Sequence, residues 1–272
     1  MEKYSVLMSL YIKEKPEYLE QSIDSMLNQT VKPDEIVIVE DGPLTDELLD
    51  VLKKYKNEHP RIFNIVKSKK NLGLGLALNL GLKNCKNELV ARMDTDDISK
   101  PDRCEKQLQL FRNNSELVLV GSYIDEFYSD PSEIISTRRV PTEYKEIYEF
   151  AKRRSAFNHP TVMYKKSKII AQGGYSNLRR NQDVDLFGRM LFTGYKAANI
   201  NESLLLFRSN DDLSRRRKSW ENTKSYISTI AKLRSIGYST LNDYVIVTLG
   251  QILMFICPIN VQNWLYRKFL RK

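Results

Sequence analysis

Three aspartates stand close together at the end of a short, largely apolar run, 89–93. Such a run predicts a buried strand, and because alternate side chains of a strand share a face, Asp94 and Asp96 are expected to enter one crevice at its carboxyl end. Carboxylates this close repel each other unless a cation lies between them. Mg²⁺ and Mn²⁺ bind carboxylate and phosphate oxygens, so we expect one of these ions here. The alternative is a solvated acidic turn, including Asp97, before a helix near Pro101.

The elements that must position these aspartates alternate between strand and helix patterns, which predicts a parallel sheet wrapped by helices. Strands are expected at 5–10, 35–39, 62–66 and 89–93, and helices over 16–27, 48–52 and 74–82. Ligands of such sheets bind beyond the carboxyl ends of the strands. Ser9 and Tyr11 stand at the end of the first strand and Asp41 follows the second, which predicts a nucleotide-sized crevice. Gly73 and Gly75 lack the spacing of a phosphate loop and are expected to start and pack the third helix.

The composition is that of a globular protein with anionic partners. The 272 residues are 42% hydrophobic, which suits one large α/β domain or two smaller ones. Lys and Arg outnumber Asp and Glu by 43 to 34, and the net charge of +9 favours phosphorylated substrates or an acidic lipid surface. No basic and aromatic ladder that would stack bases is present, so no nucleic acid partner is expected. The cysteines lack metal-ligand spacing and no secretory leader pattern is seen, which predicts a cytoplasmic protein.

The section after residue 121 is less regular and holds the remaining polar candidates. His159 stands in a loop that enters a strand, and Asp183 and Asp185 open a helix whose apolar side continues to Leu191. From spacing alone, Asp183 is equally consistent with a helix N-cap and with a catalytic carboxylate. Both interpretations are open at this point.

Taken in order, these elements give the chain a resemblance to the family-two glycosyltransferases of GT-A fold, over residues 5–208. The motifs that carry it are Val37-Ile38-Val39-Glu40-Asp41-Gly42, Asn71-Leu72-Gly73, Ala91-Arg92-Met93-Asp94-Thr95-Asp96-Asp97, Asn158-His159-Pro160-Thr161, Gly173-Gly174-Tyr175 and Gln182-Asp183-Val184-Asp185-Leu186. The resemblance implies an α/β fold with a Rossmann-like, mostly parallel sheet flanked by helices, and a helical carboxyl-terminal extension. It also implies transfer of one sugar from a nucleotide diphosphate, normally a UDP-sugar, to an acceptor hydroxyl with inversion. The most similar subgroup builds bacterial capsule, exopolysaccharide or lipopolysaccharide units, which implies a lipid-linked saccharide acceptor.

Carried over residue by residue, the resemblance assigns roles to four carboxylates. Asp41 would recognise the nucleobase, Asp94 would contact the ribose or the sugar, and Asp96 would bind Mn²⁺ or Mg²⁺ on the diphosphate. Asp183 occupies the position of the catalytic base, and Gln182 stands where the family usually has Glu. One base and one metal suffice for an inverting displacement, because no covalent nucleophile is needed.

The resemblance adds further residues around these carboxylates. The donor-site residues that it implies are Ser9, Tyr11, Asn71 and Arg92. His159 is expected to lie at the acceptor site or to be structural, and Asp185 to orient its helix or to bind the acceptor. Arg208 and the basic run 215–217 are expected to be surface charges, the alternative being that they supplement the metal at the diphosphate.

Three segments are expected along the chain: 1–97 as the nucleotide-sugar-binding half, 98–210 as the acceptor-binding half, and 211–272 as a basic and apolar helical extension. Residues 244–266 carry no charge, but only 245–257 is strongly apolar, which is shorter than the roughly 20 residues that cross a bilayer. This favours an interfacial or re-entrant anchor on an anionic cytoplasmic leaflet, and hence a peripheral membrane protein. The alternative is a helix packed on the catalytic domain or on a second copy of the chain.

Two other functions compete at the level of the sequence. A sugar-phosphate nucleotidyltransferase also uses aspartates on an α/β sheet, but the place of its glycine-rich basic loop is taken here by Tyr11-Ile12-Lys13-Glu14-Lys15. The second alternative is a non-enzymatic, membrane-associated binding module. In such a protein the placement of Asp41, Asp94, Asp96 and Asp183 would have no functional reason. A processive synthase is disfavoured because a Q-x-x-R-W motif and multiple membrane spans are missing, so one sugar per acceptor is expected.

Overall fold

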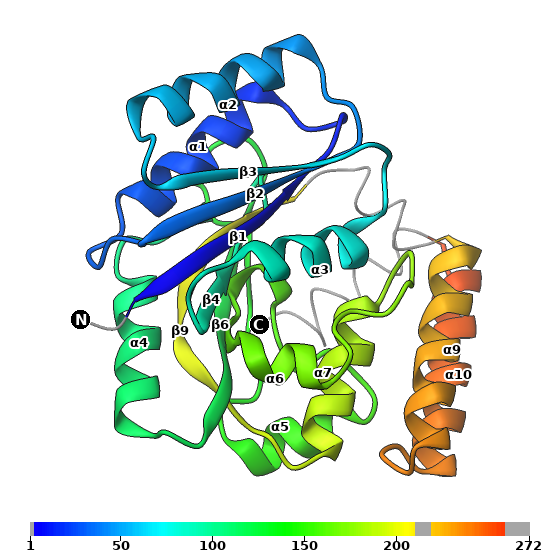
Figure 1. The fold of residues 1–272 in the computed structure, drawn as a ribbon. Coiled ribbons are helices and arrows are strands. Elements are labelled where there is room, and N and C mark those ends of the chain that lie inside the picture. The colour runs from blue at the N-terminus through cyan, green and yellow to red at the C-terminus, as the bar shows by residue number, and fades with distance from the viewer. Residues whose placement is uncertain (1–2, 210–218, 259–272) are drawn as a thin grey trace.

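One nine-stranded sheet organises the computed structural model, which describes residues 3–209 and 219–258. The strands are β1 (Tyr4–Leu10), β2 (Glu35–Asp41), β3 (Phe63–Ser68), β4 (Leu89–Arg92), β5 (Ile98–Ser99), β6 (Leu117–Phe127), β7 (Ser136–Arg138), β8 (Met163–Lys165) and β9 (Lys196–Arg208). The helices are α1 (Pro16–Leu27), α2 (Asp46–Glu58), α3 (Leu74–Asn84), α4 (Arg103–Asn113), α5 (Tyr144–Ala151), the short η1 (His159–Thr161), α6 (Lys166–Ala171), α7 (Gln182–Phe192), α9 (Trp220–Ser235) and α10 (Leu241–Ile256). The strand order is β3-β2-β1-β4-β8-β6-β9-β5, and β7 pairs with β6 outside this path (Figure 1).

The first four strands form a parallel half-sheet in the order β3-β2-β1-β4. Helices cover both of its faces, with α1 and α2 on one side and α3 on the other (Figure 1). Alternate side chains of β1 therefore enter two different cores: Leu7 packs in the core under α3, and Met8 in the core under α1 and α2. The predicted strands and helices of this half are confirmed, with their ends moved by a few residues.

The helix α3 approaches the sheet closely at Gly81. A Cβ at this position would lie 2.2 Å from Cδ1 of Leu7 and 2.9 Å from Cγ2 of Val39. At the start of the helix, Gly73 has a φ of 84°, which favours glycine. A Cβ at Gly75 would lie 3.0 Å from the carbonyl oxygen of Ser176. The expectation that these two glycines start and pack the helix is confirmed.

Beyond β4 the sheet is mixed. β8 pairs antiparallel with β4 and β6, β6 and β9 run parallel, and β5 adds antiparallel to β9. The expected parallel order is therefore continuous as far as β4, and beyond it one parallel pair, β6 and β9, lies among antiparallel ones. Ile98 and Ser99 were expected in a loop, but they form β5, because Ile98 pairs with Leu206 of β9. A two-residue strand has no periodicity that could predict it. The same sheet runs through segments 1–97 and 98–210.

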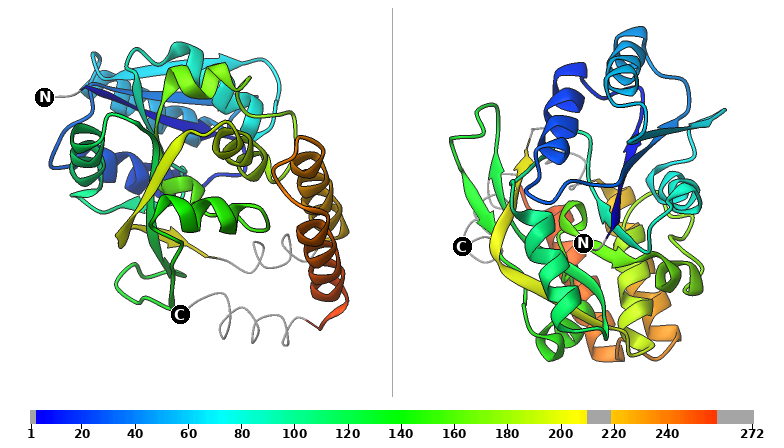
Figure 2. Two further views of the ribbon diagram at one scale, coloured as in Figure 1. Left: turned by 90° about the horizontal axis from the view of Figure 1, so that it is seen from below. Right: turned by 60° about the vertical axis from the view of Figure 1, so that its left-hand side comes forward.

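The helices α9 and α10 form a hairpin that lies beside α7 (Figure 2). A Cβ at Gly188 of α7 would lie 2.7 Å from Cδ1 of Leu233, so α7 and α9 are in close contact. Thr240 and Asp243 form a capping box at the start of α10. The predicted helical extension is therefore confirmed for the two helices that the structure describes.

The expected membrane anchor falls only partly within the described residues. The first part of the uncharged stretch forms α10, whereas 259–266 and the basic run 215–217 lie outside the described residues. Within 3–209 and 219–258, none of the helices is both long enough and apolar enough to cross a bilayer.

Candidate active site

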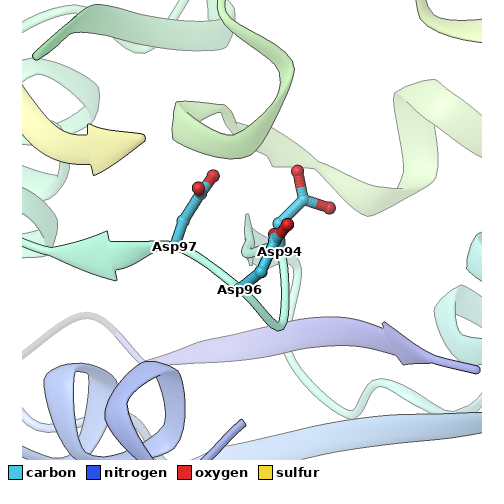
Figure 3. A group of neighbouring side chains, drawn as sticks. All are labelled: Asp94, Asp96 and Asp97. Atoms are coloured by element: carbon cyan, nitrogen blue, oxygen red, sulfur yellow. The ribbon is translucent and has the colours of Figure 1, made fainter. Parts of the chain in front are cut away.

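The three aspartates that follow β4 form one acidic cluster. Ligand oxygens of Asp94, Asp96 and Asp97 all lie within 4.8 Å of one another. Figure 3 shows the three side chains projecting to the same side of the loop between β4 and β5. The structure thus brings Asp94 and Asp96 together beyond the carboxyl end of β4, as the sequence predicts. It also adds Asp97, which the sequence left as part of a turn.

Asp94 is held by the buried guanidinium of Arg92. Nη1 of Arg92 donates to Oδ2 of Asp94 over 2.7 Å, and Nη2 pairs with Oδ1, which makes the contact two-pronged. Arg92 is only 1% exposed. Arg92 was predicted to contact the sugar nucleotide. In the structure its guanidinium is instead buried under the cluster, where it fixes the direction of the Asp94 carboxylate.

The remaining two aspartates are crowded in a way that suits a bound cation. Asp97 is fully buried, and its Oδ2 finds no hydrogen-bond donor among the described residues. Burial, together with the charges of Asp96 and Asp94, raises the pKa of Asp97 well above its usual range. Burial, followed by Asp94 and Glu14, raises the pKa of Asp96 to about 7. A divalent cation with oxygen ligands would relieve both the repulsion and the missing donor, so the residues fit such an ion.

The loop that carries the cluster is clamped by Arg208 at the end of β9. Its main-chain N–H donates to Oδ1 of Asp97 over 2.9 Å, and its Nε donates to the carbonyl oxygen of Asp96 over 3.0 Å. The guanidinium carbon lies 3.9 Å from the ring centroid of Tyr18 and 4.6 Å from that of Phe127. Arg208 is 4% exposed. The expectation of a surface charge is therefore wrong for Arg208, because the stacked rings and hydrogen bonds hold it inside.

Glu14 is a fourth carboxylate at the cluster, and no sequence pattern predicted it. It lies in the loop between β1 and α1, where Oε2 accepts a 2.5 Å hydrogen bond from the hydroxyl of Thr95 and Oε1 accepts one from the N–H of Lys15. Its charge acts on Asp96. Ser9 is half-buried near the end of β1, and Tyr11, just beyond it, is 37% exposed. The loop that follows the first strand therefore reaches the cluster through Glu14, and the contact of Ser9 and Tyr11 with a sugar nucleotide stays a prediction.

The second strand end is closed by Asp41, the last residue of β2. Its carboxylate accepts hydrogen bonds from the N–H groups of Leu72, over 2.6 Å, and Gly73, over 3.1 Å. The amide of Asn71 donates to the carbonyl oxygen of Asp41 over 3.2 Å. The structure thus brings together Asp41 and Asn71, both predicted for the donor site. The recognition of a nucleobase by Asp41 stays a prediction.

Asp183 lies in the first turn of α7, which begins at Gln182. The N-cap residue is Asn181, with a left-handed φ of 58°, so the N-cap interpretation of Asp183 is wrong. Burial raises the pKa of Asp183, although the N–H groups of Val184 and of Asp183 itself act in the opposite direction. The positive charge of Arg92, which pairs with Asp94, also acts on Asp183, so one guanidinium influences both carboxylates.

His159 and Tyr175 form a buried pair on which the charge of Arg92 also acts. Nε2 of His159 is 2.9 Å from the hydroxyl of Tyr175, and the imidazole packs against Tyr175 and Phe187. Burial, followed by the charge of Arg92, lowers the pKa of His159 well below its usual range. The imidazole is therefore neutral near pH 7, and its contacts are those of a residue that supports Tyr175.

Asp185, two positions after Asp183, points away from the site. It is fully buried and accepts from the hydroxyl of Ser176 over 2.6 Å. Its carboxylate also pairs with Arg189, over 2.9 Å, and with Lys232 of α9, over 2.6 Å. The structure therefore favours the expected role of Asp185 in orienting α7. The alternative prediction, direct contact with an acceptor, is wrong because no part of Asp185 is accessible.

Comparison of the sequence with known proteins shows which family it matches. The model described as "Glycosyl transferase family 2" matches residues 5–175. The amylovoran biosynthesis glycosyltransferase AmsE of Erwinia amylovora is 38% identical over 97% of this chain and 98% of its own length. An Escherichia coli protein named UDP-Gal:alpha-D-GlcNAc-diphosphoundecaprenol beta-1,3-galactosyltransferase is 33% identical over 99% of this chain and 97% of its own length.

Solved structures share the fold at much lower identity. The mannosyltransferase PcManGT from Pyrobaculum calidifontis, in complex with GDP-Man and Mn²⁺, has a TM-score of 0.64 at 14% identity and covers 97% of this chain and 84% of its own. Residues 1–349 of S. aureus TarS, in complex with UDP, have a TM-score of 0.61 at 16% identity and cover 98% and 72%. These likenesses confirm the fold class expected from the sequence.

Proposed function

Because the chain belongs to glycosyl transferase family 2, and is therefore a glycosyltransferase, we propose that it moves one sugar from a UDP-sugar to a hydroxyl of a lipid-linked saccharide, with inversion. The observation that carries this proposal is the acidic cluster beyond β4, whose Asp94 pairs with Arg92, while the charge of Arg92 also acts on Asp183. A donor diphosphate at the cluster would bring its anomeric carbon toward Asp183. Family membership sets aside the nucleotidyltransferase and the non-enzymatic module.

The donor is assigned to the three adjoining strand ends. Asp41 at the end of β2 and Asn71 in the loop before α3 are proposed to hold the nucleobase. Ser9, Tyr11 and Asp94 are proposed to contact the rest of the nucleotide sugar. Two observations on other proteins support a UDP-sugar: TarS was solved with UDP, and the E. coli relative is named for UDP-Gal. The ends of neighbouring parallel strands are also where ligands of such sheets bind.

Asp96 is proposed to hold a divalent cation, with Asp94 and Asp97 beside it. Mn²⁺ and Mg²⁺ both suit these oxygen ligands. The orphaned Oδ2 of buried Asp97 and the raised pKa of Asp96 support the assignment, as does the Mn²⁺ in the PcManGT complex. When bound, such an ion supplies positive charge to the departing diphosphate.

Asp183 is proposed to act as the general base. Its carboxylate would accept the proton of the acceptor hydroxyl while that oxygen forms a bond to the anomeric carbon and the carbon–oxygen bond to the diphosphate breaks. Burial raises the pKa of Asp183, which makes the carboxylate a stronger base than an exposed aspartate. Gln182, in place of the family's usual Glu, is buried and adds no second charge beside it. Arg92 steadies the Asp94 carboxylate on the donor side.

The acceptor is proposed to be a saccharide on a lipid diphosphate, at the cytoplasmic face of a membrane. The name of the E. coli relative specifies a diphosphoundecaprenol-linked acceptor, and AmsE is named for the biosynthesis of amylovoran. We propose the same class of reaction here, one step in the assembly of a bacterial polysaccharide repeat unit.

The test is transfer from a panel of UDP-sugars, including the galactose, glucose and N-acetyl forms, to a short-chain polyprenyl-diphosphate monosaccharide in Mn²⁺, with a GDP-sugar tested in parallel. We expect one donor to give a product enlarged by a single sugar, and proton NMR of that product to show an inverted anomeric configuration. Asp183→Asn serves as the control for background hydrolysis. A product with retained configuration, or transfer only from a GDP-sugar, would contradict the proposal.

A further inference from the structure

The helix α10 exposes a continuous apolar face. Among the described residues, sixteen large hydrophobic side chains are exposed, and nine of these belong to the α9–α10 hairpin. We define the α10 stripe as the six of them that repeat at helical spacing: Leu241, Val245, Leu249, Ile252, Leu253 and Ile256. At about 100° per residue they fall within an arc of roughly 120°. Leu249 is 64% exposed and Ile256 71%.

The rest of the hairpin does not account for this stripe. The residues that α10 buries are Asp243 and Val247, which lie on its opposite side and face the hairpin and the catalytic domain. A contiguous exposed apolar face of this size is unusual on a protein surface and marks a contact with another molecule. The helix has 16 residues, about 24 Å at 1.5 Å per residue, so it is suited to lie in a membrane surface and not to cross it.

Charge decides which partner fits the stripe. From Tyr244 to Lys272 the sequence has no acidic residue, and it ends in a basic group at 267–272; a second basic run, 215–218, precedes α9. The rings of Trp220 and Phe255 lie 5.3 Å apart, so the beginning of α9 and the end of α10 share one end of the hairpin. Both basic runs are therefore joined in sequence to that end. Anionic lipid headgroups complement this charge, whereas a second copy of the chain would bring the same positive charge with it.

The hairpin is also tied to the proposed catalytic base. The hydroxyl of Ser225 on α9 donates to the carbonyl oxygen of Arg180 over 3.1 Å and accepts from the side-chain amide of Asn181 over 3.2 Å. These two residues directly precede α7, whose first turn carries Asp183. The position of the hairpin thus fixes the position of the start of α7.

We propose that the α10 stripe docks into the surface of an anionic lipid bilayer, so that α9 and α7 hold Asp183 at a set height above a lipid-linked acceptor. Docking into the bilayer is inferred from the α10 stripe and the charges alone. The positioning of Asp183 above the acceptor rests on the proposed function. Membrane binding and glycosyl transfer can therefore be tested separately.

The experiment uses the full chain and vesicles of phosphatidylcholine with and without about one third phosphatidylglycerol. The test variant is Val245→Ser/Leu249→Ser/Leu253→Ser, whose three side chains are exposed. The matched control is Ile134→Ser/Ile135→Ser, which removes two exposed apolar side chains from the segment between β6 and β7. We expect the test variant to lose roughly tenfold or more of its partitioning into anionic vesicles, the control to keep it, and added salt to weaken binding of the unchanged protein.

Thermal unfolding and UDP affinity in Mn²⁺ are measured on all three proteins, and light scattering gives their mass without lipid. Retained vesicle binding by the test variant would overturn the inference. So would a dimer that the test variant converts to a monomer, because the stripe would then be a subunit interface. Loss of vesicle binding at unchanged unfolding temperature supports membrane docking, even if no UDP-sugar proves to be a donor and the proposed function fails.

Discussion

The main-chain N–H of Arg208 donates a 2.9 Å hydrogen bond to Oδ1 of Asp97, although 111 residues separate them in sequence. This bond joins the end of β9 to the acidic cluster. It leaves Oδ2 of Asp97 without a donor among the described residues, beside Asp94 and Asp96. The carboxylates of the proposed metal site are therefore held in place by a strand from the second half of the sheet.

Arg208→Lys is expected to weaken the affinity for UDP in Mn²⁺ by roughly tenfold. Lysine keeps the positive charge but loses both the planar contact with Tyr18 and the Nε hydrogen bond to the Asp96 carbonyl. Titration calorimetry measures the effect. Arg234→Lys, at an exposed position of α9, is the matched control. Equal affinities in the two variants would show that the clamp does not set the ligand geometry.

Asp96→Asn is expected to remove most of the Mn²⁺-dependent part of UDP binding, by on the order of a hundredfold or more, because the diphosphate charge is then poorly compensated. Calorimetry with and without Mn²⁺ separates this part from the metal-independent part. Asp102→Asn, which alters a partly exposed aspartate paired with Lys106, controls for a general loss of negative charge. An unchanged response to Mn²⁺ in Asp96→Asn would rule out Asp96 as a ligand.

Glu14→Gln is expected to lower the apparent affinity for Mn²⁺ severalfold, since glutamine can still accept from Thr95 but no longer adds negative charge near Asp96. Mn²⁺ binding can be followed by electron paramagnetic resonance, independently of turnover. Glu17→Gln, on the exposed side of α1, is the control. If both variants bind Mn²⁺ as tightly as the unchanged protein does, Glu14 has no part in metal binding and only stabilises the loop between β1 and α1.

Asp183→Asn and Asp185→Asn are expected to fail in different ways. The first should keep UDP affinity and thermal stability while lowering kcat on the order of 10²–10⁴-fold, the usual size of a general-base effect. The second leaves Arg189 and Lys232 without their buried partner, and should cost about 3–5 kcal/mol of folding free energy. Single-turnover kinetics and denaturant unfolding distinguish them. Full activity in Asp183→Asn would remove it from the mechanism.

The pH dependence of kcat should show an acidic limb set by Asp183. The base acts in its deprotonated form, and burial raises its pKa, so activity is expected to fall as pH drops through a value above that of an ordinary aspartate. His159 adds no limb near neutrality, because its lowered pKa keeps the imidazole neutral there. The profile is measured at saturating donor and Mn²⁺. A limb that persists unchanged in the residual activity of Asp183→Asn would assign it to another group.

The sequence determined the parallel half of the sheet and the place of its ligand site. The strands β1, β2 and β4 are apolar runs with both faces buried, and their ends carry Ser9, Asp41 and Asp94. Period and polarity are local properties, so they are readable before the chain folds. The spacing of the aspartates also predicted the crowding of Asp94 with Asp96, which the structure shows, whereas the family resemblance added roles for these residues.

Only the tertiary structure decided which polar side chains face the site. Asp183 and Asp185 are two positions apart on α7 and so point to nearly opposite sides of the helix. Spacing alone does not distinguish the two sides, but in the structure Lys232 of α9 pairs with the fully buried Asp185, which is therefore out of reach of an acceptor. Arg208 and Glu14 join the acidic cluster through contacts with Asp97 and Thr95 that are remote in sequence. Such contacts depend on how strands and loops pack, which no local pattern encodes.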